Sequence, residues 1–169
     1  EDPRRQRQMC IRDRYNRPNE IDELLKSFSR LEGDKDFEIV IIEDGSTKKC
    51  DHIVKSFSDL NISYHLKSNS GPGDSRNYGM SVAKGKYYVI LDSDVILPVN
   101  YNVLLIENLT NDFSDCFGGV DDSHQSFNNF QKAVSYSMTS FITTGHIRGG
   151  SKSKDFQPRS FNMGISKEA

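Results

Sequence analysis

Two aspartates separated by one serine, Asp92-Ser93-Asp94, come directly after the apolar run at 87–91. Carboxylates this close together at the end of a strand can supply oxygen ligands to a hard divalent cation such as Mg²⁺ or Mn²⁺. Such a cation takes its other ligands from water and substrate phosphates, and it neutralises charge on a diphosphate leaving group. Alone, an Asp-x-Asp sequence is more often a solvated turn. The apolar run before it and the apolar segment 95–98 after it favour a metal site.

A second acidic pair follows another apolar run, because Glu43-Asp44-Gly45-Ser46 comes directly after 37–42. One interpretation is a turn from strand to helix, in which Gly45 gives backbone freedom and Ser46 caps the helix. The other is a binding role, in which Asp44 accepts a hydrogen bond from a nucleobase or a ribose. These residues alone leave both interpretations open.

The segment 71–79 reads Gly-Pro-Gly-Asp-Ser-Arg-Asn-Tyr-Gly and places a glycine-bearing turn before a predicted helix. Backbone N–H groups at a helix N-terminus can bind phosphate, and Arg76 adds a charged donor. The segment lacks the ending of a P-loop, and it does not follow the first strand as a dinucleotide-binding fingerprint does. The structural alternative is that Gly79 lets the helix approach the sheet.

From residue 15 onward, apolar residues alternate between helical and strand spacing. A helix is predicted to start near Pro18 and to bury Ile21, Leu24, Leu25, Phe28 and Leu31. Strands are predicted at 37–42, 61–66 and 87–91. We expect Ser46 to cap a helix with the apolar face Ile53, Val54, Phe57 and Leu60. A third helix is expected to turn Tyr78 and Val82 inward and to end at Gly85.

This alternation indicates an α/β domain with a mostly parallel sheet and flanking helices. The ligand crevice of such a sheet lies at the carboxyl ends of its strands. Both acidic motifs, at 43–44 and 92–94, follow predicted strands. We therefore expect them to share one edge of the sheet.

The pattern continues beyond Pro98 with a predicted helix at about 100–110 and strands at about 114–118 and 159–165. Between these strands we predict a longer helix with the apolar stripe Phe127, Phe130, Val134, Met138 and Phe141. The basic stretch 148–154 is interpreted as a solvated loop, with contact to an anionic acceptor as the alternative. Ser166 and the three residues after it resemble an N-cap and the first turn of a helix.

Composition narrows the class of protein. The 169 residues suffice for one domain with a real core, and the net charge of −2 favours neither nucleic acid nor an anionic membrane as partner. No apolar run approaches the roughly 18 residues of a membrane-spanning helix. Three widely spaced cysteines indicate reduced thiols in a cytosolic protein.

Residues 1–14 do not continue the pattern. They show neither strand nor helix periodicity, and the chain does not begin with Met. We interpret them as a non-native or disordered segment, with a basic solvated tail as the alternative. The remaining residues, 15–169, are interpreted as a partial domain truncated at its C-terminus, in which the first strand of the sheet is missing.

Four motifs in order resemble the family 2 glycosyltransferases: Tyr15-Asn16-Arg17-Pro18, Glu43-Asp44-Gly45-Ser46, the segment 75–85, and Leu91-Asp92-Ser93-Asp94. The resemblance covers roughly 15–169 and is most specific between 38 and 98. It implies the Rossmann-like GT-A fold and a metal-dependent transfer of sugar, with inversion, from a nucleotide-diphosphate donor.

The resemblance also implies roles for individual residues. Tyr15 and Asp44 would contact the nucleobase of the donor. Asp92 would lie near the ribose and the diphosphate, and Asp94, together with Asp92, would hold Mn²⁺ or Mg²⁺. Arg76 is the further candidate for nucleotide binding, as a donor to phosphate.

The catalytic base is not assigned, because the family's acidic base would lie beyond Ala169. Asp121 is a weak candidate, placed by the resemblance near the sugar and acceptor pocket. Segment 161–164 resembles the strand that lines the acceptor side. Without a base, the chain is expected to be inactive as it stands.

The expected partners are a UDP- or GDP-sugar donor and a saccharide or lipid-linked acceptor, in bacterial surface-polysaccharide or glycoconjugate synthesis. The expected location is the cytoplasm, including the inner face of the membrane. Two alternatives remain. A nucleotidyltransferase shares the sheet and the metal aspartates, although the glycine-rich signature that it needs after its first strand is not visible. A non-catalytic nucleotide-sugar-binding module would show the same motifs.

Overall fold

The computed structural model describes residues 7–12, 16–119 and 162–169. In this part of the chain, six strands form one sheet in the order β3-β2-β1-β4-β6-β5. In chain order the strands are β1 (Arg7–Arg12), β2 (Phe37–Asp44), β3 (Ile62–Lys67), β4 (Tyr87–Asp92), β5 (Cys116–Gly118) and β6 (Asn162–Ser166). The strands β1 to β4 are parallel to their neighbours among themselves, whereas β6 runs antiparallel to both β4 and β5. The prediction of a mostly parallel sheet in an α/β domain is confirmed.

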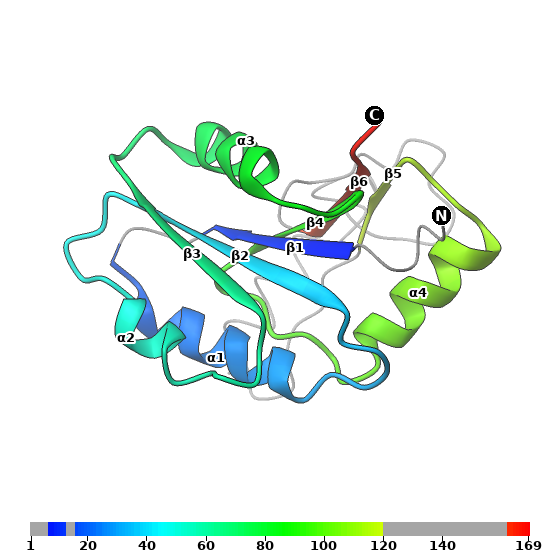
Figure 1. Ribbon diagram of the computed structural model, residues 1–169, viewed down its shortest axis with the longest axis horizontal. Coiled ribbons are helices and arrows are strands. Elements are labelled where there is room, and N and C mark those ends of the chain that lie inside the picture. The colour runs from blue at the N-terminus through cyan, green and yellow to red at the C-terminus, as the bar shows by residue number, and fades with distance from the viewer. Residues whose placement is uncertain (1–6, 13–15, 120–161) are drawn as a thin grey trace, which may run out of the picture.

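Helices cover both faces of this sheet (Figure 1). α1 (Pro18–Ser29), α2 (Asp51–Val54) and α4 (Tyr101–Asn111) lie on one face, and α3 (Pro72–Val82) lies on the other. Strand β2 serves both sides, because Ile39 and Ile41 pack on the α1 side while Val40 and Ile42 pack on the α3 side. Burial on both faces explains why β2 is a continuous apolar run rather than an alternating one.

Strand β1 corrects the expectation that the first strand is missing. It lies in the middle of the sheet, where Met9 is paired with Ile39 of β2 and with Val89 of β4. The sequence failed to indicate this strand because only three apolar residues stand between charged and amide residues. Backbone hydrogen bonds to β2 and β4 stabilise this strand, although its side-chain pattern does not indicate one. The division of the chain at residue 15, with a non-native segment before it, stays a prediction.

Helix α1 forms where the sequence predicted it. Pro18 occupies the first turn, where its missing N–H costs no hydrogen bond. Four apolar side chains on one stripe are fully buried, namely Ile21, Leu24, Leu25 and Phe28. Each such burial stabilises the fold by about 1.5–3 kcal/mol relative to exposure. Because α1 is packed against the sheet, the residues of its first turn are held in fixed positions.

Three details of the middle segment differ from the prediction. Helix α2 has only four residues, and its N-cap is Cys50 rather than Ser46. Ser46 is instead buried, and its Oγ accepts a hydrogen bond from the Asn16 backbone at 3.3 Å. In α3 the buried residues are Ser75 and Gly79, whereas Tyr78 is 37% exposed. The helix faces β1 and β2 through small residues, so a tyrosine on its outer side remains accessible.

The end of α3 is also different, because Ala83 is the C-cap and has an extended backbone. Gly85 is therefore not the residue that terminates the helix. The predicted elements near 100–110, 114–118 and 159–165 correspond to α4, β5 and β6. The predicted long helix and the basic stretch 148–154 lie outside the described residues. Ser166 ends β6, and its Oγ accepts a hydrogen bond from the Ala169 backbone at 3.2 Å, as an N-cap serine does.

Within the described ranges, no helix combines the length and the apolar character needed to cross a membrane.

Candidate functional site

The carboxyl ends of three neighbouring parallel strands form one edge of the sheet. Arg12, the last residue of β1, is paired with Ile42 on one side and with Asp92 on the other. Asp44 lies two residues beyond Ile42 on β2. Neighbouring strands are about 4.8 Å apart, so the ends of β2 and β4 are separated by about 10 Å across β1. The expectation that the two acidic motifs share one edge is confirmed.

At the end of β4, successive side chains are held from opposite faces of the sheet. Asp92 Oδ1 accepts a hydrogen bond from Arg76 Nη2 of α3 at 3.0 Å, and both side chains are largely buried. The next residue, Ser93, is fully buried, and its Oγ donates to Glu20 Oε2 of α1 at 2.9 Å. Asp92 is the last residue of β4 and Ser93 is the first residue of the turn that follows, and their side chains contact α3 and α1 respectively. Asp94 follows and is exposed.

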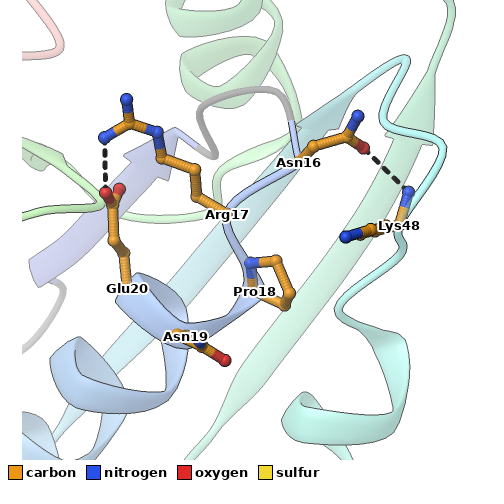
Figure 2. A pocket seen from close by; sticks show the side chains of 6 residues that line it. All are labelled: Asn16, Arg17, Pro18, Asn19, Glu20 and Lys48. Carbon is orange, nitrogen blue, oxygen red and sulfur yellow. Dashed lines mark hydrogen bonds and ion pairs between the residues drawn. The ribbon is translucent and has the colours of Figure 1, made fainter.

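Glu20 also holds the residue just before α1. Its Oε1 lies 2.7 Å from Arg17 Nη1 (Figure 2). The hydrogen bond and the charge of Glu20, with a smaller contribution from Asp94, raise the pKa of Arg17 above its ordinary value. Arg17 and Asp94 are thus close enough to interact electrostatically. Sequence reasoning missed the Glu20 contact, because Glu20 and Ser93 are 73 residues apart.

Asp44 is 3% exposed and accepts hydrogen bonds from three donors of its own chain. Lys67 Nζ donates to Oδ1 at 2.8 Å, the Ser70 backbone donates to Oδ1 at 2.9 Å, and the Gly71 backbone donates to Oδ2 at 2.9 Å. Burial acts to raise the pKa of Asp44, whereas these hydrogen bonds favour the ionised form. The net result is a pKa below the ordinary value.

These contacts favour the structural interpretation of Asp44, since they fasten the segment that leads from β3 into α3. Lys67 extends the connection, because its Nζ also lies 3.2 Å from Asp74 Oδ2. The two carboxylates raise the pKa of Lys67. The nucleobase contact of Asp44 stays a prediction.

The guanidinium of Arg76 has an N–H donor at this edge that no described residue accepts from. Its Nε is buried and has no hydrogen-bond partner among the described residues, while Nη2 is taken by Asp92. A buried N–H without an acceptor is costly, so an anionic group that reached this position would be favoured. This arrangement fits the predicted contact of Arg76 with a nucleotide phosphate.

A pocket of about 450 Å³ opens beside the start of α1, lined by Asn16, Arg17, Pro18, Asn19, Glu20 and Lys48 (Figure 2). Asn16 has a left-handed backbone, with φ of 63°, a conformation that asparagine tolerates better than most residues. Its Oδ1 accepts hydrogen bonds from the backbones of Thr47 and Lys48 at 2.9 and 2.8 Å. Asn16 thereby ties the start of α1 to the loop after β2. Tyr15 and Asp121 lie outside the described residues.

Asp92 and Asp94 are the described residues that fit the predicted cation. Both offer carboxylate oxygens at the end of β4, and Asp94 is accessible from solvent. In the ranges that the structure covers, no cluster of three or more His, Cys, Asp or Glu side chains is arranged to hold a metal. A hard cation bound here would therefore take most of its ligands from water and phosphate, which suits Mg²⁺ or Mn²⁺.

Comparison with known proteins supports the same fold. An uncharacterized glycosyltransferase of Rickettsia conorii is 43% identical over 81 residues, which are 47% of this chain and 13% of that protein. The poly(ribitol-phosphate) beta-N-acetylglucosaminyltransferase TarS of Staphylococcus aureus strain Mu50 is 37% identical over 84 residues, which are 47% of this chain and 15% of that protein. The chain thus spans less than a sixth of the length of these two relatives.

Solved structures agree over a longer stretch. The structure of S. aureus TarS 1–349 with UDP matches 72% of this chain and 37% of that chain, with a TM-score of 0.64 and 25% identity. The mannosyltransferase PcManGT of Pyrobaculum calidifontis, with GDP-Man and Mn²⁺, matches 70% of this chain and 36% of that chain, with a TM-score of 0.60 and 22% identity. The second match shows the fold alone.

The family profile described as glycosyl transferase family 2 matches residues 14–165, which is most of the chain. The motifs that suggested this resemblance lie within the match, and the fold agrees with it. The chain belongs to glycosyl transferase family 2 and has the Rossmann-like GT-A fold.

Proposed function

We propose that this protein acts in the transfer of a sugar from a nucleotide-diphosphate donor to an acceptor, in a metal-dependent and inverting reaction. The observation that carries the proposal is the end of β4, where Asp92 pairs with Arg76 and the exposed Asp94 follows two residues later. Family membership favours this activity over that of a nucleotidyltransferase. A non-catalytic nucleotide-sugar-binding module remains as the alternative, and the experiment below addresses it.

Asp94, together with Asp92, would hold Mn²⁺ or Mg²⁺. When bound, the cation would neutralise charge that develops on the departing diphosphate. Arg76 would orient Asp92 through the 3.0 Å contact and offer its remaining buried donor to a phosphate oxygen. The N-terminus of α3 would add its dipole to the binding of this anion.

Asp44 and Tyr15 would bind the nucleobase. Asn16 holds the loop after β2, and Asp44 holds the segment before α3, so a base bound at this edge would meet a fixed surface. UDP and UDP-GlcNAc in TarS structures and GDP-Man in PcManGT support a UDP- or GDP-sugar as donor. No described residue is proposed as the catalytic base, and Asp121 is kept as the weak candidate. The proposed acceptor is a saccharide or a lipid-linked group in cell-envelope synthesis, at a cytoplasmic site.

The test is to measure binding of UDP and GDP by calorimetry in Mn²⁺ and in EDTA, with wild-type protein and Asp94→Asn. A diphosphate beside two carboxylates is repelled without a cation, so affinity should fall at least tenfold on chelation and in the variant. Asp22→Asn, which removes an exposed charge from α1, should bind like the wild type. Equal affinity with and without EDTA would exclude the metal role. Release of sugar from a UDP-sugar by this chain, followed over time, would identify it as an enzyme and would show that the base lies within it.

A further inference from the structure

The side chain between the two proposed metal ligands is held by a residue that the family motifs do not include. Ser93 is fully buried, and its hydroxyl donates to Glu20 in the first turn of α1. We propose that Glu20 is a positioning residue that sets the Asp92-Ser93-Asp94 turn for cation binding. This inference rests on the proposed function, because it concerns the same carboxylates.

The contact is well suited to fix the turn. A buried hydroxyl that loses its acceptor is costly, so the turn is strongly biased toward conformations in which Ser93 reaches Glu20. Ser93 is bonded directly to both aspartates along the backbone. Restricting its side chain therefore restricts the directions that Asp92 and Asp94 can take.

The support behind Glu20 is rigid. The helix that carries it buries Ile21 and Leu24 completely against the sheet. The side chain of Glu20 is only 23% exposed. The contact therefore ties the turn after β4 to a packed helix rather than to a mobile loop. Residues outside the ligand set commonly orient metal ligands by hydrogen bonds, and here the bond is made to Ser93, the residue between the two proposed ligands.

Arg17 balances the charge of Glu20 in an acidic neighbourhood. Glu20 adds a third negative charge to a region that already contains Asp92 and Asp94, and like charges repel. The ion pair of 2.7 Å between Arg17 and Glu20 offsets that repulsion. One oxygen of Glu20 thus balances charge while the other accepts from Ser93.

The experiment compares Glu20→Ala, Glu20→Gln and Ser93→Ala with the wild type and with the control Asp22→Asn. The control removes a carboxylate from the same helix, where it pairs with exposed Lys26 at 2.6 Å. Mn²⁺ affinity is measured in the presence of saturating UDP from the decrease of the free Mn²⁺ signal in electron paramagnetic resonance. Melting temperature and UDP affinity in EDTA are measured in parallel.

We expect Glu20→Ala and Ser93→Ala each to weaken Mn²⁺ binding about tenfold, as loss of an orienting residue does. The double variant should be no weaker than either single variant, because both remove the same hydrogen bond. Glu20→Gln keeps an oxygen that accepts from Ser93 and should retain near wild-type Mn²⁺ affinity. UDP affinity in EDTA should be unchanged in all variants that fold.

Two results would overturn the proposal. Unchanged Mn²⁺ affinity in folded Glu20→Ala would show that the turn does not need this support. A Glu20→Gln variant as weak as Glu20→Ala would assign the effect to the charge beside Arg17 rather than to the Ser93 hydrogen bond. If the wild type itself binds no Mn²⁺ with UDP, the proposed function fails, and that outcome is distinct from both.

Discussion

Replacing Asp44 with alanine separates its structural role from its proposed contact with the nucleobase. The carboxylate receives Lys67 Nζ at 2.8 Å and the backbone N–H groups of Ser70 and Gly71 at 2.9 Å each. All three donors belong to the segment that leads into α3. Asp44→Ala should therefore destabilise the fold as well as weaken nucleotide binding.

The magnitude follows from the burial of the ion pair. The side chain of Asp44 is 4% exposed and that of Lys67 is 15% exposed, and removing one partner of a buried pair costs about 3–5 kcal/mol. Lys67 keeps Asp74 at 3.2 Å after the substitution, so the lower end, about 3 kcal/mol, applies. For a domain of this size each kcal/mol lowers the melting temperature by about 2–4 °C, which gives about 6–12 °C.

The assay is urea denaturation of Asp44→Ala and of Asp22→Ala, combined with calorimetric titration of UDP. Asp22→Ala is the matched control, because it also removes one carboxylate from an ion pair, here the exposed pair with Lys26. It should cost about 0.5 kcal/mol. If Asp44→Ala costs less than about 1 kcal/mol while UDP affinity falls tenfold, Asp44 serves the ligand rather than the turn, and the reasoning above is refuted.

Three further predictions concern the same edge. The pKa of Asp44 is lowered in the folded state. Its contribution to stability is therefore complete above its unfolded pKa of about 3.9 and is lost as pH falls through the folded value. Urea denaturation from about pH 2 to 6 should show a weaker loss of stability at acid pH in Asp44→Ala than in the wild type, and identical pH profiles would contradict this. Gly45 has φ of +74°, and an added Cβ would lie 2.8 Å from the Asn69 backbone nitrogen; Gly45→Ala should cost about 2 kcal/mol of unfolding free energy, whereas Gly73→Ala, with nothing within 4 Å of its added Cβ, should be neutral or slightly stabilising. Arg76→Ala removes the partner of Asp92 and should weaken UDP binding in Mn²⁺ about tenfold by calorimetry; unchanged affinity would show that Arg76 serves only the fold.

The elements that the sequence predicted best are those whose side-chain pattern determines their environment. Strands β2 and β4 are apolar because both of their faces are covered, and α1 shows its buried stripe directly. Strand β1 was missed because its position depends on backbone pairing with two neighbours rather than on its own pattern. A short apolar core between charged residues is ambiguous until those neighbours are known.

In the candidate site, too, the sequence predicted the features that depend on local pattern and missed the contacts between distant residues. Adjacent acids after apolar strands predicted that Asp44 and Asp92 would share an edge, since parallel strands end together. The contacts that hold the edge join residues far apart in the chain, such as Ser93 with Glu20, which are 73 positions apart. Ser46 was predicted to cap a helix because serine is a good capping residue. Its hydroxyl instead accepts a hydrogen bond from the Asn16 backbone. Local propensity thus indicated that the Ser46 hydroxyl accepts a backbone hydrogen bond, but not that the donor is Asn16.

The end of β4 is held by two helices that lie on opposite faces of the sheet. Asp92 points toward α3 and is held by Arg76, while Ser93 points toward α1 and is held by Glu20. The last residue of the strand and the first residue of the turn after it are thus held from both sides of the sheet. Neither helix alone could do this. The exposed Asp94 then continues from a backbone whose direction is already set, so the cation that we propose would meet a ligand with little conformational freedom left to lose.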